Sequence, residues 1–188
     1  EVIAIACGRK DFQMARKYIS KVVAENYVLS HETLVPYLRL CAHFDSDVNR
    51  KAWMKVLNRI YHGNYKLEII DNRLFSGLLR ELAENGRSTD EDRVINSFMR
   101  SKFGIDPNVD TYNEILLGYV ARGDMFQANK VLQNMILKEN LGPTPLTYRA
   151  LIHGYTFNND VIAAYKCLDD LLAMSGNIEQ DDPGSDTN

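Results

Sequence analysis

A pattern that repeats every 36 residues constrains this 188-residue chain more than any other feature of its sequence. Pairs of identical residues have this separation in several independent columns: Pro107 and Pro143, Thr111 and Thr147, Tyr112 and Tyr148, Asp124 and Asp160, and Ala128 and Ala164. Periods of about 20–50 residues are typical of proteins whose units bury their apolar faces by stacking on one another. The sequence therefore predicts a stack of similar units.

Each unit is expected to consist of two antiparallel helices. In the clearest copy, apolar residues follow a spacing of three or four on both sides of Gly123-Asp124, first Tyr112, Ile115, Leu116 and Tyr119, then Ala128, Val131, Leu132 and Met135. This spacing is typical of amphipathic helices, and the Gly-Asp pair is a helix break. The predicted fold class is all-α, a solenoid of helix pairs.

Short oxygen-bearing side chains stand before five predicted second helices, at Asp11, Asp47, Ser88, Asp124 and Asp160. Such side chains accept hydrogen bonds from free N–H groups at a helix start. Ser88-Thr89-Asp90-Glu91 also has the spacing of a capping box. Five second helices are therefore predicted.

The predicted organisation is one solenoid domain followed by a tail. Its segments are a partial unit at 1–30, a degenerate unit at 31–71, three further units at 72–108, 109–144 and 145–174, and a disordered acidic tail at 175–188.

Composition narrows the classes of function. The chain is 45% hydrophobic and 25% charged, as in folded globular proteins, and its formal net charge of −3 lacks the positive excess of a non-specific nucleic-acid binder. No apolar run approaches the roughly 20 residues of a membrane span. Three scattered cysteines without a CxxC pair favour a reducing compartment.

Catalytic and metal-binding motifs are absent from the sequence. The four histidines are dispersed, and Cys41-Ala42-His43 alone is too sparse for a metal site. No GxxxxGK[ST], HExxH or GxSxG motif occurs. We therefore predict no catalytic residue, no metal site and no cofactor, and expect a binding surface instead of an enzyme.

The Thr-Tyr-Asn opening at Thr111, the Gly-Asp break, the Gly142-Pro143 loop and the 36-residue period together resemble the pentatricopeptide repeat family. The resemblance is strongest over 109–174 and weakens toward the start of the chain. Tetratricopeptide repeats are the nearest alternative, but their period is about 34 residues and they lack the Pro-terminated loop and the Thr-Tyr pair at these places.

The resemblance implies a right-handed superhelical solenoid that binds single-stranded RNA, one base per repeat, on a concave surface lined by the first helices. In the family, bases are read mainly by the residue after the Thr-Tyr pair and by the last residue of the repeat. Transferred to this chain, the base-reading candidates are Ser76 with Asn108, Asn113 with Thr144, and Arg149 without an assignable partner. The second unit would offer Val35 with Asp71, and Val35 cannot hydrogen-bond to a base.

An apolar residue three positions before the reader helps to sandwich the base in the family. Leu146 matches this position, whereas Arg73 could stack only through its guanidinium plane. Arg39, Arg73, Arg80, Arg122 and Arg149 are candidates for phosphate or stacking contacts. Acidic and basic residues are equal in number on the four complete first helices, so the predicted face is not a basic strip.

By the same resemblance, the implied role is in the processing, stability or translation of organellar transcripts. The implied compartment is the mitochondrion, with the chloroplast as the alternative, and any targeting signal is expected to lie outside this sequence. A different function stays open at this point. The solenoid could be a scaffold that docks proteins in a ribosomal or RNA-processing complex, through exposed residues such as Tyr61 and Tyr65 and the acidic tail.

Overall fold

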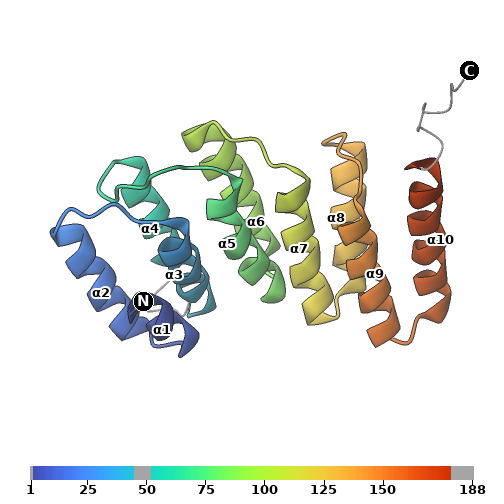
Figure 1. Cartoon of the computed structure of the whole chain (residues 1–188), viewed down its shortest axis with the longest axis horizontal. Coiled ribbons are helices and arrows are strands. Elements are labelled where there is room, and N and C mark those ends of the chain that lie inside the picture. The colour runs from blue at the N-terminus through green and yellow to red at the C-terminus, as the bar shows by residue number, and fades with distance from the viewer. Residues whose placement is uncertain (1, 45–51, 179–188) are drawn as a thin grey trace, which may run out of the picture.

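The computed structural model describes residues 2–44 and 52–178 (Figure 1). In these residues the secondary structure is helical, apart from a single bridge between Leu29 and Leu67. The elements, in chain order, are α1 (Val2–Gly8), α2 (Phe12–Ala24), α3 (His31–His43), α4 (Ala52–Tyr61), α5 (Asn72–Glu84), α6 (Ser88–Arg93), η1 (Val94–Phe103), α7 (Val109–Arg122), α8 (Met125–Leu137), α9 (Pro145–Phe157) and α10 (Val161–Ile178).

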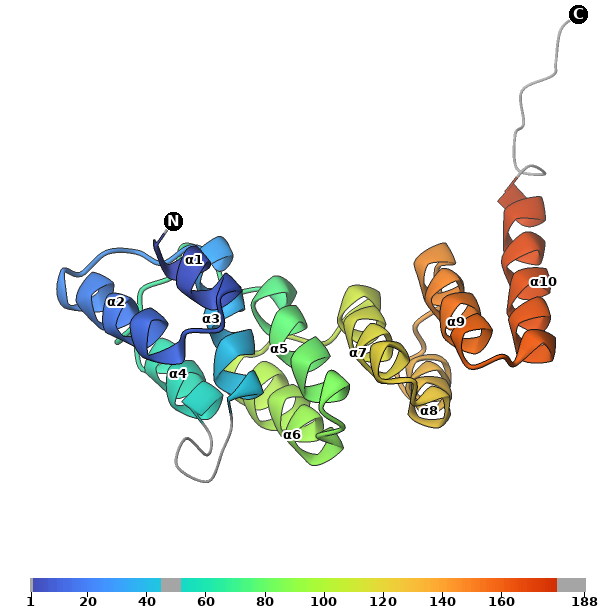
Figure 2. The same cartoon turned by 90° about the horizontal axis from the view of Figure 1, so that it is seen from below.

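The helices form consecutive antiparallel pairs, which confirms the predicted all-α solenoid. The first helices of the pairs, α1, α3, α5, α7 and α9, stand side by side, and each packs against the next. They form an arc whose ends are α1 and α9 and whose lowest part is α5 and α7, with most of the second helices on its outer side (Figure 2). Side chains at the same position of successive first helices can therefore form a row along the inside of the curve.

Three helices begin after the capping residues that the sequence predicted. Asp11 accepts a hydrogen bond from the Met14 amide (2.9 Å), Asp124 from the Gln127 amide (3.1 Å) and Asp160 from the Ala163 amide (3.1 Å). Gly123 has φ +80°, the left-handed conformation that lets α7 end and α8 begin at once. The predicted cap at Asp47 lies outside the described residues.

The predicted cap at Ser88 is wrong. Ser88 is the first residue of α6, and its N-cap is Arg87, which makes no side-chain capping bond. The first turn is held instead by the Arg87 guanidinium, whose Nη2 lies 2.6 Å from Asp90 Oδ2. Glu91, the last residue of the expected capping box, is buried and bonds elsewhere.

The third unit has a second helix of unusual form. After α6 the chain continues as the π-helix η1 over Val94–Phe103, which ends at Gly104 with φ +65°. π-Helical geometry is rare and commonly marks a local constraint. Periodicity of the sequence did not indicate it, because Val94, Phe98 and Met99 satisfy a spacing of about four equally well in an α-helix.

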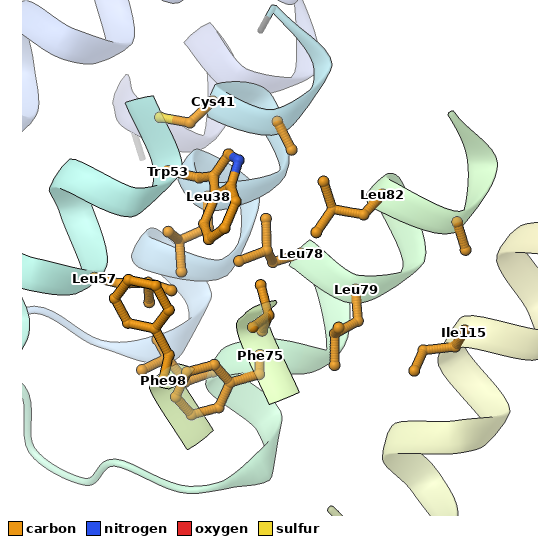
Figure 3. Close-up of a cluster of buried hydrophobic side chains, with 14 of the residues drawn as sticks. Leu38, Cys41, Trp53, Leu57, Phe75, Leu78, Leu79, Leu82, Phe98 and Ile115 are labelled. Atoms are coloured by element: carbon orange, nitrogen blue, oxygen red, sulfur yellow. The ribbon is translucent and has the colours of Figure 1, made fainter. Parts of the chain in front are cut away.

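The core runs through the stack without interruption. Figure 3 shows Leu78 of α5 on the side of Leu38 and Trp53, whereas Leu79 of the same helix lies on the side of Ile115 of α7. The rings of Trp53 and Phe98 meet edge to face, with centroids 5.9 Å apart. α5 is therefore buried on two sides, as expected for a central helix of a solenoid.

The first helices α5, α7 and α9 begin at Asn72, Val109 and Pro145. The end of the fifth unit differs from the prediction. α10 continues to Ile178, so residues 175–178 of the predicted tail are helical, and residues 179–188 lie outside the described part. Among the described helices, none is both long enough and apolar enough to cross a bilayer.

Candidate nucleic-acid interface

The predicted pair Ser76 and Asn108 is brought together by the fold. Both line a cavity of about 200 Å³ at the junction of α5 and α7. The other lining residues are all polar or charged: Asn72, Arg73, Asp110, Thr111 and Glu114. Ser76 donates a hydrogen bond only to the Arg73 carbonyl oxygen one turn earlier (2.9 Å), and it is partly exposed. Its oxygen therefore remains accessible as an acceptor.

Asn108 also has a structural role, because it is the N-cap of α7. Its Oδ1 accepts from the Thr111 amide (3.0 Å), and Thr111 Oγ1 accepts in return from the Asn108 amide (3.3 Å). Thr111 Oγ1 also lies 3.0 Å from Asn72 Oδ1 on α5. This contact links the cap of α7 to the preceding first helix and leaves the Asn108 Nδ2 group directed to no partner among the described residues.

Asn113 and Thr144 are also brought together, but in a buried network. Asn113 is only 3% exposed, and its Nδ2 donates to Thr144 Oγ1 (3.3 Å). Its Oδ1 accepts a 2.6 Å hydrogen bond from Thr147 Oγ1 of α9. Both ends of the Asn113 amide are therefore engaged in joining α7 to α9. Base reading by Asn113 stays a prediction, and it requires these bonds to be exchanged for bonds to a base.

In the second unit, the residue at the reader position, Val35, packs against the next first helix. Val35 Cγ1 lies so close to Gly77 of α5 that a Cβ atom there would be 2.5 Å away. Glycine at position 77 thus allows α3 and α5 to approach. Asp71, the predicted partner of Val35, caps α5 and pairs with Arg73.

Three of the five candidate arginines are held by carboxylates. Arg73 Nη2 lies 2.7 Å from Asp71 Oδ2, and hydrogen bonding by Arg73 holds the pKa of the Asp71 carboxyl below its ordinary value. Arg39 pairs with Glu81 (3.3 Å) and reaches Glu84 (4.0 Å). The ion pairs thus connect side chains of α3 with α5.

Arg80 continues the same series to α7. It pairs with Glu84 at 3.1 Å and with Glu114 at 3.6 Å. Together with the Arg39 pairs, these contacts form an alternating row of charges across α3, α5 and α7. A phosphate would have to displace a carboxylate to bind Arg39 or Arg80.

Arg122 and Arg149 differ from the other three because neither forms an ion pair with any described residue. Both side chains are exposed. The Arg122 guanidinium covers Gly86 at the end of α5, where a Cβ atom would lie 2.8 Å from its Nη1. Leu146, the predicted sandwich residue, is 48% exposed on the first turn of α9 beside Arg149. The free cations of the predicted set therefore lie toward the end of the solenoid.

Sequence reasoning missed Asn72 as a member of the site. Asn72 precedes the Thr-Tyr column and carries no periodic signal of its own, yet its Oδ1 is the partner of Thr111. Glu114, one of the acidic residues of the first helices, is both a wall of the cavity and a partner of Arg80.

Arranged in this way, the chain is a helical-repeat solenoid with polar side chains collected at the junctions of its first helices. Residues 107–156 match the model of the pentatricopeptide repeat family. Residues 107–156 therefore carry pentatricopeptide repeats, and the described chain has the same fold as solved proteins that contain them. A comparison with curated protein sequences gives no match.

Solved structures of the same fold cover most of the chain. The maize pentatricopeptide repeat protein PPR10, in complex with an 18-nucleotide psaJ RNA element, matches 93% of it with a TM-score of 0.65 and 17% identity. This chain spans 24% of that protein. The pentatricopeptide domain of Arabidopsis thaliana protein-only RNase P 1, in complex with tRNA, matches with a TM-score of 0.53 and 16% identity, covering 92% of this chain and 86% of that domain. Nuclear proteinaceous RNase P 2 from the same plant matches with a TM-score of 0.51 and 16% identity, over 90% of this chain and 36% of that chain.

Proposed function

We propose that this chain is a single-stranded RNA-binding module that acts in the processing, stability or translation of organellar transcripts. The observation that carries the proposal is the junction of α5 and α7, where Ser76 and Asn108 share one cavity between adjacent first helices. Two proteins of the same fold are described in complex with RNA. The module would position RNA and carry out no catalytic step itself.

In the proposed complex, the edge of one base faces Ser76 and Asn108. The Ser76 hydroxyl and the Asn108 amide can donate and accept hydrogen bonds, as discrimination among bases requires. Arg73 is 69% exposed at this cavity and could stack its guanidinium plane on the base while it stays paired with Asp71. Leu146 and Arg149 would hold the strand one unit further on.

The proposal is tested by titrating the protein at low salt with labelled single-stranded RNA and with a duplex of the same sequence. We expect the single strand to bind more tightly. Because Arg149 has no carboxylate partner, Arg149→Gln should weaken binding about two- to threefold across sequences and reduce the salt dependence by about one charge. Arg39→Gln is the matched control, and its smaller effect is expected because Arg39 is already paired. Equal binding of single strand and duplex would overturn the proposal.

A second candidate function, protein docking, is favoured by the exposed apolar surface of α9 and α10. A cavity of about 330 Å³ there is lined by Ile152, Thr156, Val161, Ala164, Tyr165 and Leu168. These residues follow Leu116, Val120, Met125, Ala128, Asn129 and Leu132 by 36 positions. In the preceding unit, Val120 and Met125 contact Gly154 of α9, and Asn129 bonds to Tyr155.

The occupant that fits this surface is therefore an amphipathic helix with a small residue in the place that Gly154 takes. Such a helix would come from a partner in a ribosomal or RNA-processing complex. Of the two tyrosines first expected to dock proteins, Tyr61 is 48% exposed, but Tyr65 is buried at 4% and cannot serve. Leu168→Asp should abolish capture of such a partner after nuclease treatment, and retained capture would exclude this surface.

The mitochondrion is the proposed compartment, with the chloroplast as the alternative. Imaging of the tagged full-length protein tests this assignment. Nuclear staining, as the description of one similar protein would suggest, would contradict it.

A further inference from the structure

The second helices α2 and α4 do not pack directly against each other, as is also the case for η1 and α8. No Cα atom of α2 lies within 8 Å of one of α4. The space between them is a cavity of about 380 Å³, here called the basic cavity, whose polar lining comprises Arg16, Ser20, Tyr37, Lys55, Arg59 and Tyr65. Its volume lies within the range of about 300–1,000 Å³ that small-molecule sites occupy.

Three cations converge on the basic cavity without a carboxylate among its lining residues. Arg16 comes from α2, and Lys55 and Arg59 come from successive turns of α4. None of the three forms an ion pair with a residue in 2–44 or 52–178. Like charges four residues apart on a helix repel each other. An anion in the cavity would turn this repulsion into attraction.

Two tyrosine side chains complete the polar lining of the basic cavity. Tyr37 and Tyr65 are each 4% exposed and form buried walls of the cavity. Arg59 Nη1 donates to Tyr65 Oη (3.1 Å), which fixes the direction of the guanidinium. Burial raises the pKa of the Tyr37 hydroxyl, which therefore keeps its proton and adds no negative charge to the cavity.

A second cavity shows that stacking alone does not produce this charge pattern. The cavity of about 260 Å³ bordered by α6, η1, α7 and α8 also contains two cations, Arg100 and Lys138. It is lined as well by Glu91, Asp92 and Glu139, and Arg100 Nη2 lies 2.5 Å from Glu139 Oε2. There the positive charges are neutralised by neighbouring carboxylates, whereas no carboxylate in residues 2–44 or 52–178 forms an ion pair with the cations of the basic cavity.

We propose that the basic cavity is a binding site for a phosphate monoester, the group carried by nucleotides and by the 5′ ends of RNA strands. Its oxygens would accept hydrogen bonds from Arg16, Lys55 and Arg59, which are strong because both partners are charged. The site's three cations come from the second helices α2 and α4, and its lining contains none of the predicted base readers. It therefore stands or falls independently of RNA binding along the first helices.

The experiment is calorimetric titration of the whole chain with inorganic phosphate and with AMP, in a phosphate-free buffer of constant ionic strength. We expect saturable binding of both. Arg16→Gln and Lys55→Gln should each weaken it roughly tenfold, the effect of losing one hydrogen bond between charged partners. Lys17→Gln is the matched control, because Lys17 is an exposed cation on α2 that does not line the cavity. It should leave the affinity within about twofold, because an exposed charge outside the site is largely screened.

Two further arms distinguish the sources of the phosphate. Tighter binding of AMP than of the 5′-phosphorylated RNA identifies a free nucleotide as the ligand. Tighter binding of a 5′-phosphorylated RNA than of the same 5′-hydroxyl RNA, lost in Lys55→Gln, identifies a strand end. The proposal is overturned if no saturation occurs at millimolar phosphate, or if Lys17→Gln weakens binding as much as Lys55→Gln. Circular dichroism of each variant checks that the helices are retained.

Discussion

The junctions α5–α7 and α7–α9 use the same threonine column in different ways. Thr111 and Thr147 are one period apart, and each places its hydroxyl next to an asparagine oxygen on the preceding first helix. At α5–α7 that asparagine is Asn72, at the start of its helix. At α7–α9 it is Asn113, four residues further along the unit. The same bond is thus made from two different positions of the repeat.

This difference decides which predicted readers are free. Because Asn72 makes the structural bond at α5–α7, Ser76 remains available beside the cavity. At α7–α9 the residue in the reader position, Asn113, makes that bond itself and is buried. One position of a repeat can therefore serve recognition in one unit and cohesion in the next.

The closeness of the helices also separates the two junctions, and it predicts the largest effect. A Cβ atom at Gly118 would lie 2.5 Å from Ala83 Cβ and 2.6 Å from the Arg80 carbonyl oxygen, so α7 touches the backbone of α5. Gly118→Ala should lower the free energy of unfolding by about 3 kcal/mol, because backbone cannot move aside as a side chain can. Urea denaturation followed by circular dichroism measures the loss.

Gly154→Ala is the matched change one period later. There the added Cβ meets mainly the flexible side chain of Met125, with Sδ at 2.5 Å. Adjustment of Met125 and the higher helix propensity of alanine should keep the change within about 1 kcal/mol. Equal losses in the two variants would show that the junctions are equally close.

A tyrosine pair gives the next prediction, which concerns pH. Tyr119 of α7 donates to Glu91 of α6 (2.8 Å), whereas Tyr155 of α9, one period later, bonds to the neutral Asn129 of α8. Burial, with Asp92 and Asp90 adding to it, raises the pKa of Glu91 from its ordinary 4.5 to about 7, although the Tyr119 hydrogen bond opposes this shift. Between these values the folded protein retains a proton that the unfolded chain releases. Stability should therefore fall as pH rises from about 4.5 to about 7, by on the order of 2 kcal/mol.

The measurement is the free energy of unfolding at several pH values from about 4.5 to about 7.5, which spans the window between the two pKa values. Glu91→Gln should flatten this dependence, since glutamine still accepts the Tyr119 hydrogen bond and does not ionise. Asp106→Asn is a suitable control, because Asp106 is an exposed carboxylate (91%) that does not line the cavity of Glu91. A variant Glu91→Gln with an unchanged pH profile would contradict the assignment.

The threonine column itself gives the smallest of the three effects. Thr147→Val removes the donor to buried Asn113 and leaves its Oδ1 without a partner, which should cost about 1–2 kcal/mol. Thr111→Val removes the contact to Asn72, which is partly exposed and can bind water instead, so its cost should be less. A larger loss of stability in Thr111→Val than in Thr147→Val, measured by thermal or urea unfolding, would contradict this difference between the buried Asn113 and the partly exposed Asn72.

Local features were predictable where the signal lies within one helix or one turn. Asp11, Asp124 and Asp160 cap helices as expected, since a side chain that bonds three residues ahead needs no tertiary partner. Ser88 failed because the competing Arg87–Asp90 contact already held that turn. The pairing of Ser76 with Asn108 was implied by the family resemblance, but their shared cavity also depended on Asn72, which no pattern marked.

The order of residues along this chain dictates the 36-residue period, the alternation of two helices and the threonine column, because these depend on contacts within a unit or on a constant offset between units. The state of each polar side chain depends on the neighbouring helix. Whether Asn113 is free, whether Arg80 is neutralised by Glu114, and whether Arg16 and Lys55 face one cavity depend on distances across the stack. Hydrogen bonds and ion pairs change strongly over an ångström, and helix periodicity does not specify spacing between helices that finely.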